Sequence, residues 1–232
     1  MSEIILKVKN LNVELGGEEI IKNLSFEVKK GEIFTVLGPN GAGKTVLLKT
    51  LLGFLPYQGE IIWQKKIRIG YLPQGLSPLK VRDLPVSVRE FFKLKGILEE
   101  KTLEFLKLVG IKNNLFLKKR IGDLSSGQFQ RMLIAWALVS KPDVLLFDEP
   151  MAGIDVSGEK TIYSLLHQFR KDKNLTIFLI THDLNVVYKY SDNVLCLRKK
   201  GFRCSGPPQR VLSPRVLENL YGTEIKFYKH IR

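Results

Sequence analysis

The sequence predicts an α/β fold with a parallel-sheet core, an antiparallel β layer in its N-terminal part and an inserted α-helical subdomain. The first seventy residues show strand patterns, the middle carries apolar residues at helical spacing, and strands and helices alternate again from residue 143. With 232 residues, 44% of them apolar, the chain is long enough for one substantial core. We expect one domain, in which residues 1–74 and 143–232 form the core and residues 75–142 the helical subdomain.

The N-terminal part of the core is expected to consist mainly of strands, at residues 4–8, 24–28, 33–37 and 67–72. The run at 33–37 is apolar throughout, which is typical of a strand buried on both faces, and it ends in a Gly-rich turn. A helix is expected at residues 43–52, because leucines recur there at helical spacing and Gly53 provides a stop signal.

Helical periodicity dominates the middle of the chain, and we expect helices at residues 86–94, 101–109 and 127–139. After residue 143 the order returns to strand, helix and strand, at residues 144–147, 157–169 and 176–180. This alternation is typical of a parallel sheet flanked by helices. Short strands and a helix near residues 215–221 complete the chain.

The charge balance and the lengths of the apolar runs limit the classes of function. Lys and Arg number 37 against 23 for Asp and Glu, a formal net charge of +14. This charge favours anionic partners, although it also serves solubility alone; the basic residues are dispersed, so no nucleic-acid-binding tract stands out. The longest apolar runs, residues 132–139 and 175–180, fall short of the roughly 18 residues of a membrane span. The N-terminus also lacks a signal-peptide pattern, and we expect a cytosolic protein.

Two cysteines, Cys196 and Cys204, are too few for a disulfide framework and fit a reducing compartment. If residues 194–198 and 202–205 pair as a hairpin, the two thiols face each other across it. A metal or redox role has little support, because the sequence has neither a CxxC pair nor neighbouring histidines.

A phosphate-binding loop follows the buried strand and precedes the first helix. The pattern GxxxxGK[ST] is met by Gly38, Pro39, Asn40, Gly41, Ala42, Gly43, Lys44 and Thr45, and Val46 continues into the helix. Its backbone N–H groups can point at phosphate oxygens, Lys44 can bridge the outer phosphates of ATP, and Thr45 can ligate Mg²⁺. The loop predicts a P-loop NTPase with a RecA-like core, but it does not separate kinases, GTPases, helicases and transport ATPases.

Two acidic residues end the apolar run at 144–147, as at the carboxyl end of a central strand. We expect Asp148 to hold Mg²⁺, directly or through water. Glu149 would then orient and deprotonate the attacking water.

Residues 124–128, Leu-Ser-Ser-Gly-Gln, resemble the LSGGQ signature of ATP-binding cassette (ABC) proteins. Gln74 resembles the Q-loop glutamine, Asp155 the D-loop aspartate and His182 the switch histidine of that family. The resemblance spans essentially the whole chain.

The resemblance implies a head-to-tail homodimer that encloses two MgATP. In such a dimer Ser125, Gly127 and Gln128 of one subunit meet the nucleotide bound to the other, and Asp155 ties the two sites together. Gln74 senses Mg²⁺ and the water, which adds it to the metal site of Thr45 and Asp148. His182 contacts the γ-phosphate and, with Glu149 and Gln74, completes the catalytic set.

Two positions depart from the family pattern. Ser126 replaces the first glycine of the usual pair, which adds a side chain close to the phosphates but is tolerable. Leu15 stands where an aromatic residue usually stacks on adenine, so weak selectivity for the base is expected.

The segment between Gln74 and the signature is too short for the coiled coils of repair ATPases, which leaves a transporter subunit. Residues 69–74 and 84–90 are similar to the ATPases of zinc and manganese importers. This similarity implies integral membrane permease subunits, an extracytoplasmic substrate-binding protein and a peripheral location at the cytoplasmic face of the membrane. Other substrates, an exporter, a non-hydrolytic nucleotide-binding module and a soluble regulatory or nucleic-acid-associated ABC protein are the alternatives, although no nucleic-acid partner is expected.

Overall fold

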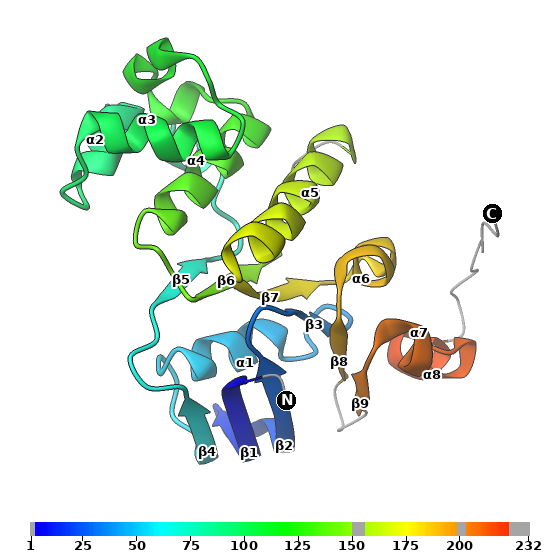
Figure 1. Cartoon of the computed structure of the whole chain (residues 1–232). Helices are drawn as coiled ribbons and strands as arrows, with labels where there is room; N and C mark the ends of the chain where they lie inside the picture. Colours follow the sequence, from blue (N-terminus) through cyan, green and yellow to red (C-terminus); the bar gives the residue numbers. More distant parts are fainter. Residues whose placement is uncertain (1–2, 150–155, 199–202, 223–232) are drawn as a thin grey trace. The chain divides into compact units, whose positions relative to one another are not determined.

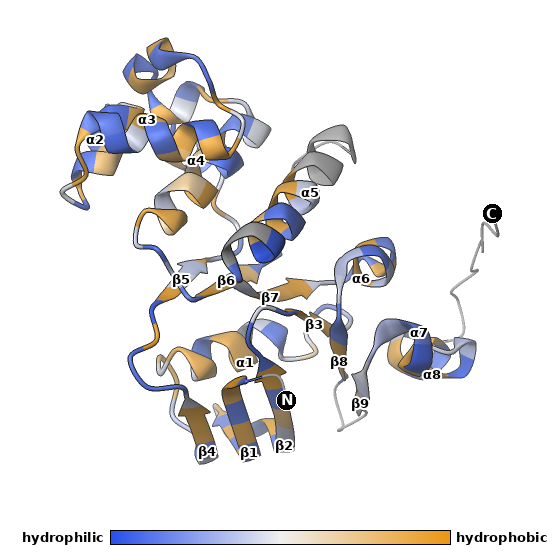
Figure 2. Cartoon of the chain, viewed as in Figure 1, coloured by the Kyte–Doolittle hydropathy of each residue, from blue (hydrophilic) through white to orange (hydrophobic). Residues whose placement is uncertain are grey.

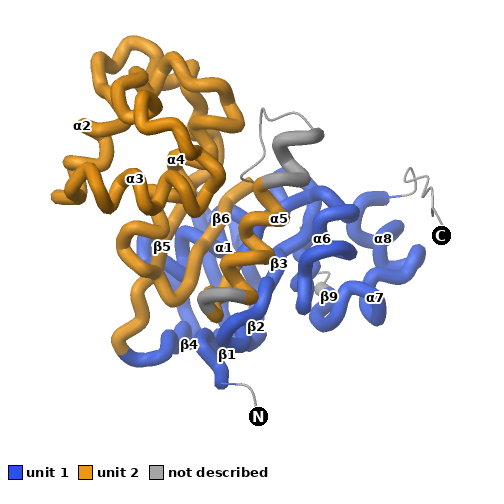
Figure 3. The backbone as a smooth tube through the Cα atoms, turned by 45° about the horizontal axis from the view of Figure 1, so that its top comes forward, with its two compact units in different colours: residues 1–65, 178–232 blue, residues 66–177 orange. Residues whose placement is uncertain are grey.

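The computed structural model describes residues 3–149, 156–198 and 203–222 (Figure 1). It divides into two compact units, one made of residues 1–65 and 178–232 and the other of residues 66–177 (Figure 3). The predicted α/β class is confirmed, since the chain forms both an antiparallel β layer and parallel strand pairs together with helices.

The antiparallel layer of the first unit has the strand order β2, β1, β4. The strands are β1 (Ile4–Leu15), β2 (Glu18–Lys29) and β4 (Gln58–Trp63). Gly16 and Gly17 join β1 to β2 with φ angles of 60° and 80°, which suits a two-residue hairpin turn. β4 was not predicted, because its residues are exposed or half-buried and show no apolar alternation.

The other strands of this unit lie in the order β7, β3, β8, β9. They are β3 (Ile33–Leu37), β7 (Thr176–Thr181, which begins at the end of the second unit), β8 (Asn193–Leu197) and β9 (Arg203–Gly206). β3 and β8 pair in parallel, whereas β8 and β9 are antiparallel. Every residue of β3 is buried, as its apolar sequence predicts.

Three phenylalanines pack the two groups of strands of the first unit together. Phe34 of β3 stacks on Phe26 of β2 with ring centroids 5.3 Å apart and on Phe178 of β7 at 5.4 Å. Such aromatic pairs contribute about 0.5–1.5 kcal/mol beyond the burial of their area. This core fixes the strand from which the phosphate loop starts.

The first unit also contains α1 (Lys44–Leu51), α6 (Leu184–Tyr190), α7 (Pro208–Val211) and α8 (Pro214–Tyr221). The predicted helices near 43–52 and 215–221 are confirmed as α1 and α8. The short helices α6 and α7 were not predicted, because one or two turns are too short for apolar periodicity to reveal.

The second unit contains the parallel strands β5 (Ile69–Leu72) and β6 (Val144–Asp148). Its α-helices are α2 (Val88–Lys93), α3 (Glu99–Leu108), α4 (Ser126–Leu138) and α5 (Val156–Lys173). Short 3-10 helices occupy Pro78–Val81, Asn114–Lys118 and Ile121–Asp123. The predicted helices of the middle segment are therefore present, and the subdomain boundary at 75–142 stays a prediction.

Orange, hydrophobic residues alternate with blue, hydrophilic ones along α2 and α4 (Figure 2). The ring centroids of Phe91, on α2, and Trp136, on α4, are 5.3 Å apart. Lys95 lies over the same ring at 3.5 Å and donates to the Trp136 carbonyl at 3.1 Å, which helps to satisfy the C-terminal end of α4. Burial lowers the pKa of the Lys95 ammonium.

The two cysteines face each other across β8 and β9, as the predicted hairpin requires. Cys196 pairs directly with Cys204, and the two Cα atoms are 4.9 Å apart. This separation is within the range of a disulfide, and the structure joins the two sulfur atoms in one. The structure therefore has a disulfide where we expected two reduced thiols. Residues that face each other directly across two antiparallel strands bring their side chains within bonding distance.

Candidate active site

The phosphate loop starts where β3 ends beside β8. A Cβ atom at Gly38 would lie 2.2 Å from the carbonyl oxygen of Leu197, the last residue of β8. No side chain fits at that separation, so the backbone of the loop can approach β8 only because residue 38 is a glycine.

The loop then curls back over its own lysine. Gly41 and Gly43 have φ angles of 76° and 92°, in the left-handed region that glycine adopts without strain. Lys44 is buried, and its Nζ donates to the carbonyl oxygens of Gly38 at 2.8 Å and Pro39 at 3.1 Å. The ammonium is thus held inside the curl of the loop, where the charge of an anion would be neutralised.

The N-terminus of α1 follows this loop directly and suits a phosphate group. Among the residues that the structure describes, no side chain caps the helix at Gly43, and its first turn contains no acidic residue. The positive end of the helix dipole and the first backbone N–H groups favour an anion at such a position. The residues present therefore fit the triphosphate of ATP.

The two predicted acidic site residues lie at the carboxyl end of β6, in the second unit. All residues of this strand are buried, and Asp148, its last, is only 1% exposed. The Asp148 carboxylate contributes, after burial, to raising the pKa of the Tyr71 phenol on the paired strand β5.

Glu149 has a strained backbone, which the sequence did not reveal. Its φ angle is +46°, in the left-handed region that costs a non-glycine residue about 1–3 kcal/mol. Strain of this kind persists where the surrounding structure holds it, often at functional sites. β6 ends at Asp148, directly before this residue, and the Glu149 side chain is half-buried.

The structure brings two of the predicted catalytic residues together. The Gln74 side chain, just beyond β5, donates from Nε2 to Oε2 of Glu149 at 2.9 Å. This contact follows from the parallel pairing of β5 and β6, which places both carboxyl ends at the same edge.

The signature segment starts α4 with a capping box. Ser125 is the N-cap residue, and its hydroxyl accepts from the Gln128 backbone N–H at 3.2 Å. The Gln128 Oε1 accepts from the Ser125 N–H at 3.4 Å in return. The spacing of a serine and a glutamine three residues later could have predicted this role from the sequence.

Gly127 lies in the first turn of the same helix. A Cβ atom built at this position meets no described atom within 4 Å. Nothing in the described part of the chain therefore requires a glycine here, whereas Gly38 is required by its own chain.

His182 lies exposed between β7 and α6. The turn around it is held by side chains on both sides: the Thr181 hydroxyl accepts from the Asp183 N–H at 3.0 Å, and Asp183 caps α6 by accepting from the Asn185 N–H at 2.8 Å. The structure thus gives His182 a defined place after β7, as predicted.

The remaining predicted contacts stay predictions. Thr45 belongs to the first unit, and Gln74 and Asp148 belong to the second, so the proposed Mg²⁺ ligand set is not assembled within either unit. Asp155 lies outside the described residues.

The profile of the family described as ABC transporter matches residues 21–152. The chain is 37% identical to the zinc import ATP-binding protein ZnuC of Rickettsia conorii, over 99% of this chain and 97% of that protein. This chain belongs to the ABC transporter family. It is an ABC ATPase, which binds ATP and couples its hydrolysis to transport.

Other similar proteins agree with this assignment. A Thermotoga maritima protein named "Probable metal transport system ATP-binding protein" is 39% identical, over 94% of this chain and 90% of its own length. The solved structure of cbiO1 from Clostridium perfringens, described as part of the ABC transporter complex cbiONQ, is 31% identical with a TM-score of 0.79 and covers 94% of both chains. The structural match therefore extends over most of this chain.

In this ABC ATPase, both residues that depart from the family pattern belong to regular secondary structure. Ser126 is the first residue of α4, and Leu15 is the half-buried last residue of β1, next to the Gly16 turn.

Among the described residues, no helix is long and apolar enough to cross a membrane.

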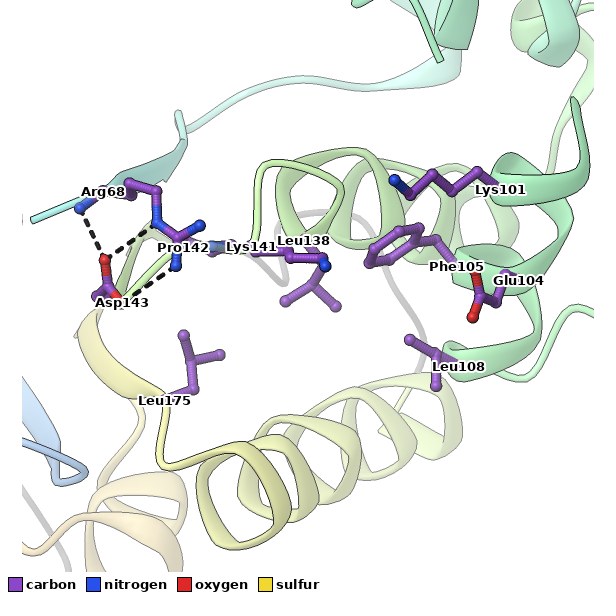
Figure 4. A pocket seen from close by; sticks show the side chains of 10 residues that line it. All are labelled: Arg68, Lys101, Glu104, Phe105, Leu108, Leu138, Lys141, Pro142, Asp143 and Leu175. Atoms are coloured by element: carbon purple, nitrogen blue, oxygen red, sulfur yellow. Dashed lines mark hydrogen bonds and ion pairs between the residues drawn. The ribbon is translucent and has the colours of Figure 1, made fainter. Parts of the chain in front are cut away.

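A cavity of about 410 Å³ in the second unit is separate from all of these residues (Figure 4). Phe105, Leu138 and Leu175 contribute its apolar lining, and Lys101 and Lys141 contribute ammonium groups. None of the predicted site residues lines this cavity, so it is separate from the predicted nucleotide site.

Proposed function

We propose that this ABC ATPase powers a metal-importing transporter whose cargo is zinc or manganese. The observation that carries the proposal is the similarity to ZnuC along nearly the full length of both chains. The Thermotoga relative, which is also named for metal transport, supports it. The chain works with integral membrane permease subunits and an extracytoplasmic substrate-binding protein, and it is peripheral to the cytoplasmic face of the membrane.

The nucleotide is bound by the phosphate loop of one copy and by the signature of a second copy. Lys44 neutralises the outer phosphates while the N–H groups at the start of α1 donate to their oxygens. In the facing copy, the open space beside Gly127 lets the backbone of α4 approach the γ-phosphate. Two nucleotides therefore hold a head-to-tail homodimer together.

Hydrolysis requires Glu149 to accept a proton from the attacking water. Gln74, which already donates to Glu149, fixes the orientation of the carboxylate, and His182 contacts the γ-phosphate. Thr45, Gln74 and Asp148 hold Mg²⁺, which supplies charge neutralisation when it is bound. Asp148 offers a carboxylate, the type of oxygen ligand that Mg²⁺ prefers, at the buried carboxyl end of β6.

The variant Glu149→Gln tests the proposed role of Glu149 as the residue that accepts the proton from the attacking water. The variant keeps the size of the side chain and an oxygen that can accept from Gln74, but it cannot accept a proton. We expect ATP binding to persist, turnover to fall by at least about 100-fold, and an ATP-bound dimer to accumulate in size-exclusion chromatography. Turnover at the wild-type rate would remove Glu149 from the catalytic role.

Deletion of the gene for this chain from its source cell tests which metal the transporter carries. Uptake of zinc, manganese, iron and copper is measured under metal starvation, with complementation by wild type and by Glu149→Gln. Selective loss of zinc or manganese uptake, restored by wild type alone, supports the importer. Unchanged uptake of all four metals favours another cargo or an exporter.

DNA or RNA added to the purified protein tests the alternative of a soluble nucleic-acid-associated ATPase. The +14 charge is the observation that favours this alternative. Stimulation of turnover by nucleic acid would support it, and co-purification with membrane proteins would oppose it.

A further inference from the structure

Two tyrosines connect α6 with the C-terminal helices of the first unit. The Tyr188 hydroxyl, on α6, donates to the Leu212 carbonyl between α7 and α8 at 2.8 Å. The Tyr221 hydroxyl, at the end of α8, donates to the His182 carbonyl just before α6 at 3.4 Å. The two bonds have the same chemistry, but only the second reaches a predicted catalytic residue.

The helix that carries Tyr221 is firmly placed. Leu217 and Leu220 of α8 are 2% and 1% exposed and lie in one core cluster with Leu37, the last residue of β3 before the phosphate loop. The Tyr221 side chain packs against the edge of this cluster. Ser213 caps the start of α8, and the Gly222 N–H donates to the Glu218 carbonyl at its end. The phenol therefore approaches His182 from a rigid support.

We propose that Tyr221 is a positioning residue for His182: its hydroxyl holds the carbonyl of His182 and so fixes the direction in which the imidazole leaves the backbone. The inference rests on the proposed role of His182 at the γ-phosphate. The Thr181 hydroxyl accepts from the Asp183 N–H, which belongs to the same peptide group as the His182 carbonyl. The bond from Tyr221 holds the carbonyl side of this peptide group, so the group is held at both of its polar atoms.

The phenol stays a donor over the physiological pH range. Burial, and then the charge of the Asp183 carboxylate, raise the pKa of Tyr221 well above its ordinary value. The hydroxyl is therefore neutral at physiological pH. The donor–acceptor distance of 3.4 Å is longer than that of the Tyr188 bond, so we expect a moderate effect on the rate rather than an absolute requirement.

Tyr221→Phe tests the proposal, because it removes the hydroxyl and keeps the ring against the core cluster. We expect kcat of the purified full chain to fall about three- to tenfold, as for the loss of one hydrogen bond that orients a catalytic group. KM for ATP should stay unchanged, since the phosphate loop and α1 are untouched. A purely structural role would not produce this separation of kcat from KM.

Tyr188→Phe is the matched control. It removes a shorter bond of the same kind between the same helices, and we expect its thermal stability to fall at least as much while kcat stays at the wild-type value. An equal loss of kcat in Tyr188→Phe and Tyr221→Phe would overturn the inference, because it would reflect general loosening of α6 and α8.

His182→Ala separates failure of the inference from failure of the proposed function. If this variant loses turnover while Tyr221→Phe matches wild type, the role of Tyr221 is wrong and that of His182 stands. If His182→Ala turns over at the wild-type rate, both roles are wrong. Support requires a large loss in His182→Ala, a moderate one in Tyr221→Phe and no loss in Tyr188→Phe.

Discussion

Replacement of Gly38 by alanine should displace the phosphate loop from β8. The added Cβ atom would lie 2.2 Å from the Leu197 carbonyl oxygen and 3.2 Å from its carbonyl carbon. Both atoms belong to the backbone of β8, which pairs with β3 on one side and β9 on the other, so neither can rotate away. The loop itself must move by more than about 1 Å to restore the ordinary contact distance of about 3.5 Å.

The size of the effect follows from this clash. Overpacking of a well-packed region costs about 1–3 kcal/mol. In a chain of this size, 1 kcal/mol changes the melting temperature by about 2–4 °C, so we expect a decrease of roughly 2–12 °C. Because the displaced backbone carries the N–H groups that face the phosphates, the affinity for ATP should fall at least about tenfold, by analogy with the cost of a 1 Å misplacement in a site.

Gly127→Ala is the matched control for this substitution. Its Cβ atom meets no described atom within 4 Å, and alanine favours a helix over glycine by up to about 1 kcal/mol. We expect an unchanged or higher melting temperature and unchanged ATP binding to the single chain, but much slower turnover, because the methyl group enters the space facing the second nucleotide. Calorimetry and titration with a fluorescent nucleotide measure both variants. A Gly38→Ala protein with wild-type stability and affinity would refute the reasoning.

Three further predictions concern single side chains. Lys44→Ala should weaken ATP binding at least about tenfold, since it removes the charge held inside the loop; an unchanged affinity in titration would count against the phosphate-loop assignment. Ser125→Ala should lower the free energy of unfolding by about 1 kcal/mol through loss of the α4 cap, and should slow turnover more than this loss explains; calorimetry and ATPase assays separate the two. Leu15→Phe should tighten ATP binding by up to about 1–3 kcal/mol if it stacks on adenine, whereas wild type should bind ATP and GTP similarly; strong adenine preference in wild type would contradict this.

Most of the fold could be predicted because local patterns agreed with tertiary burial. The apolar run at 33–37 became the fully buried β3, and the helical periodicity at 127–139 became α4, Ser126–Leu138. β4 escaped prediction because its side chains are largely exposed, and α6 because two turns give too little periodicity. Elements without a contrast between buried and exposed positions carry little signal in the sequence.

The candidate site also has features that the sequence predicts and contacts that only the fold shows. The chemistry could be predicted from the sequence, because the phosphate loop, the paired acids and the signature are short contiguous motifs, and His182 directly follows a predicted strand. Only the tertiary structure decided which distant residues meet. The Gln74 contact to Glu149 spans 75 positions, and the Tyr221 contact to His182 spans 39. Such pairs depend on which strand ends and helix ends share an edge, and this is set by the packing of whole elements.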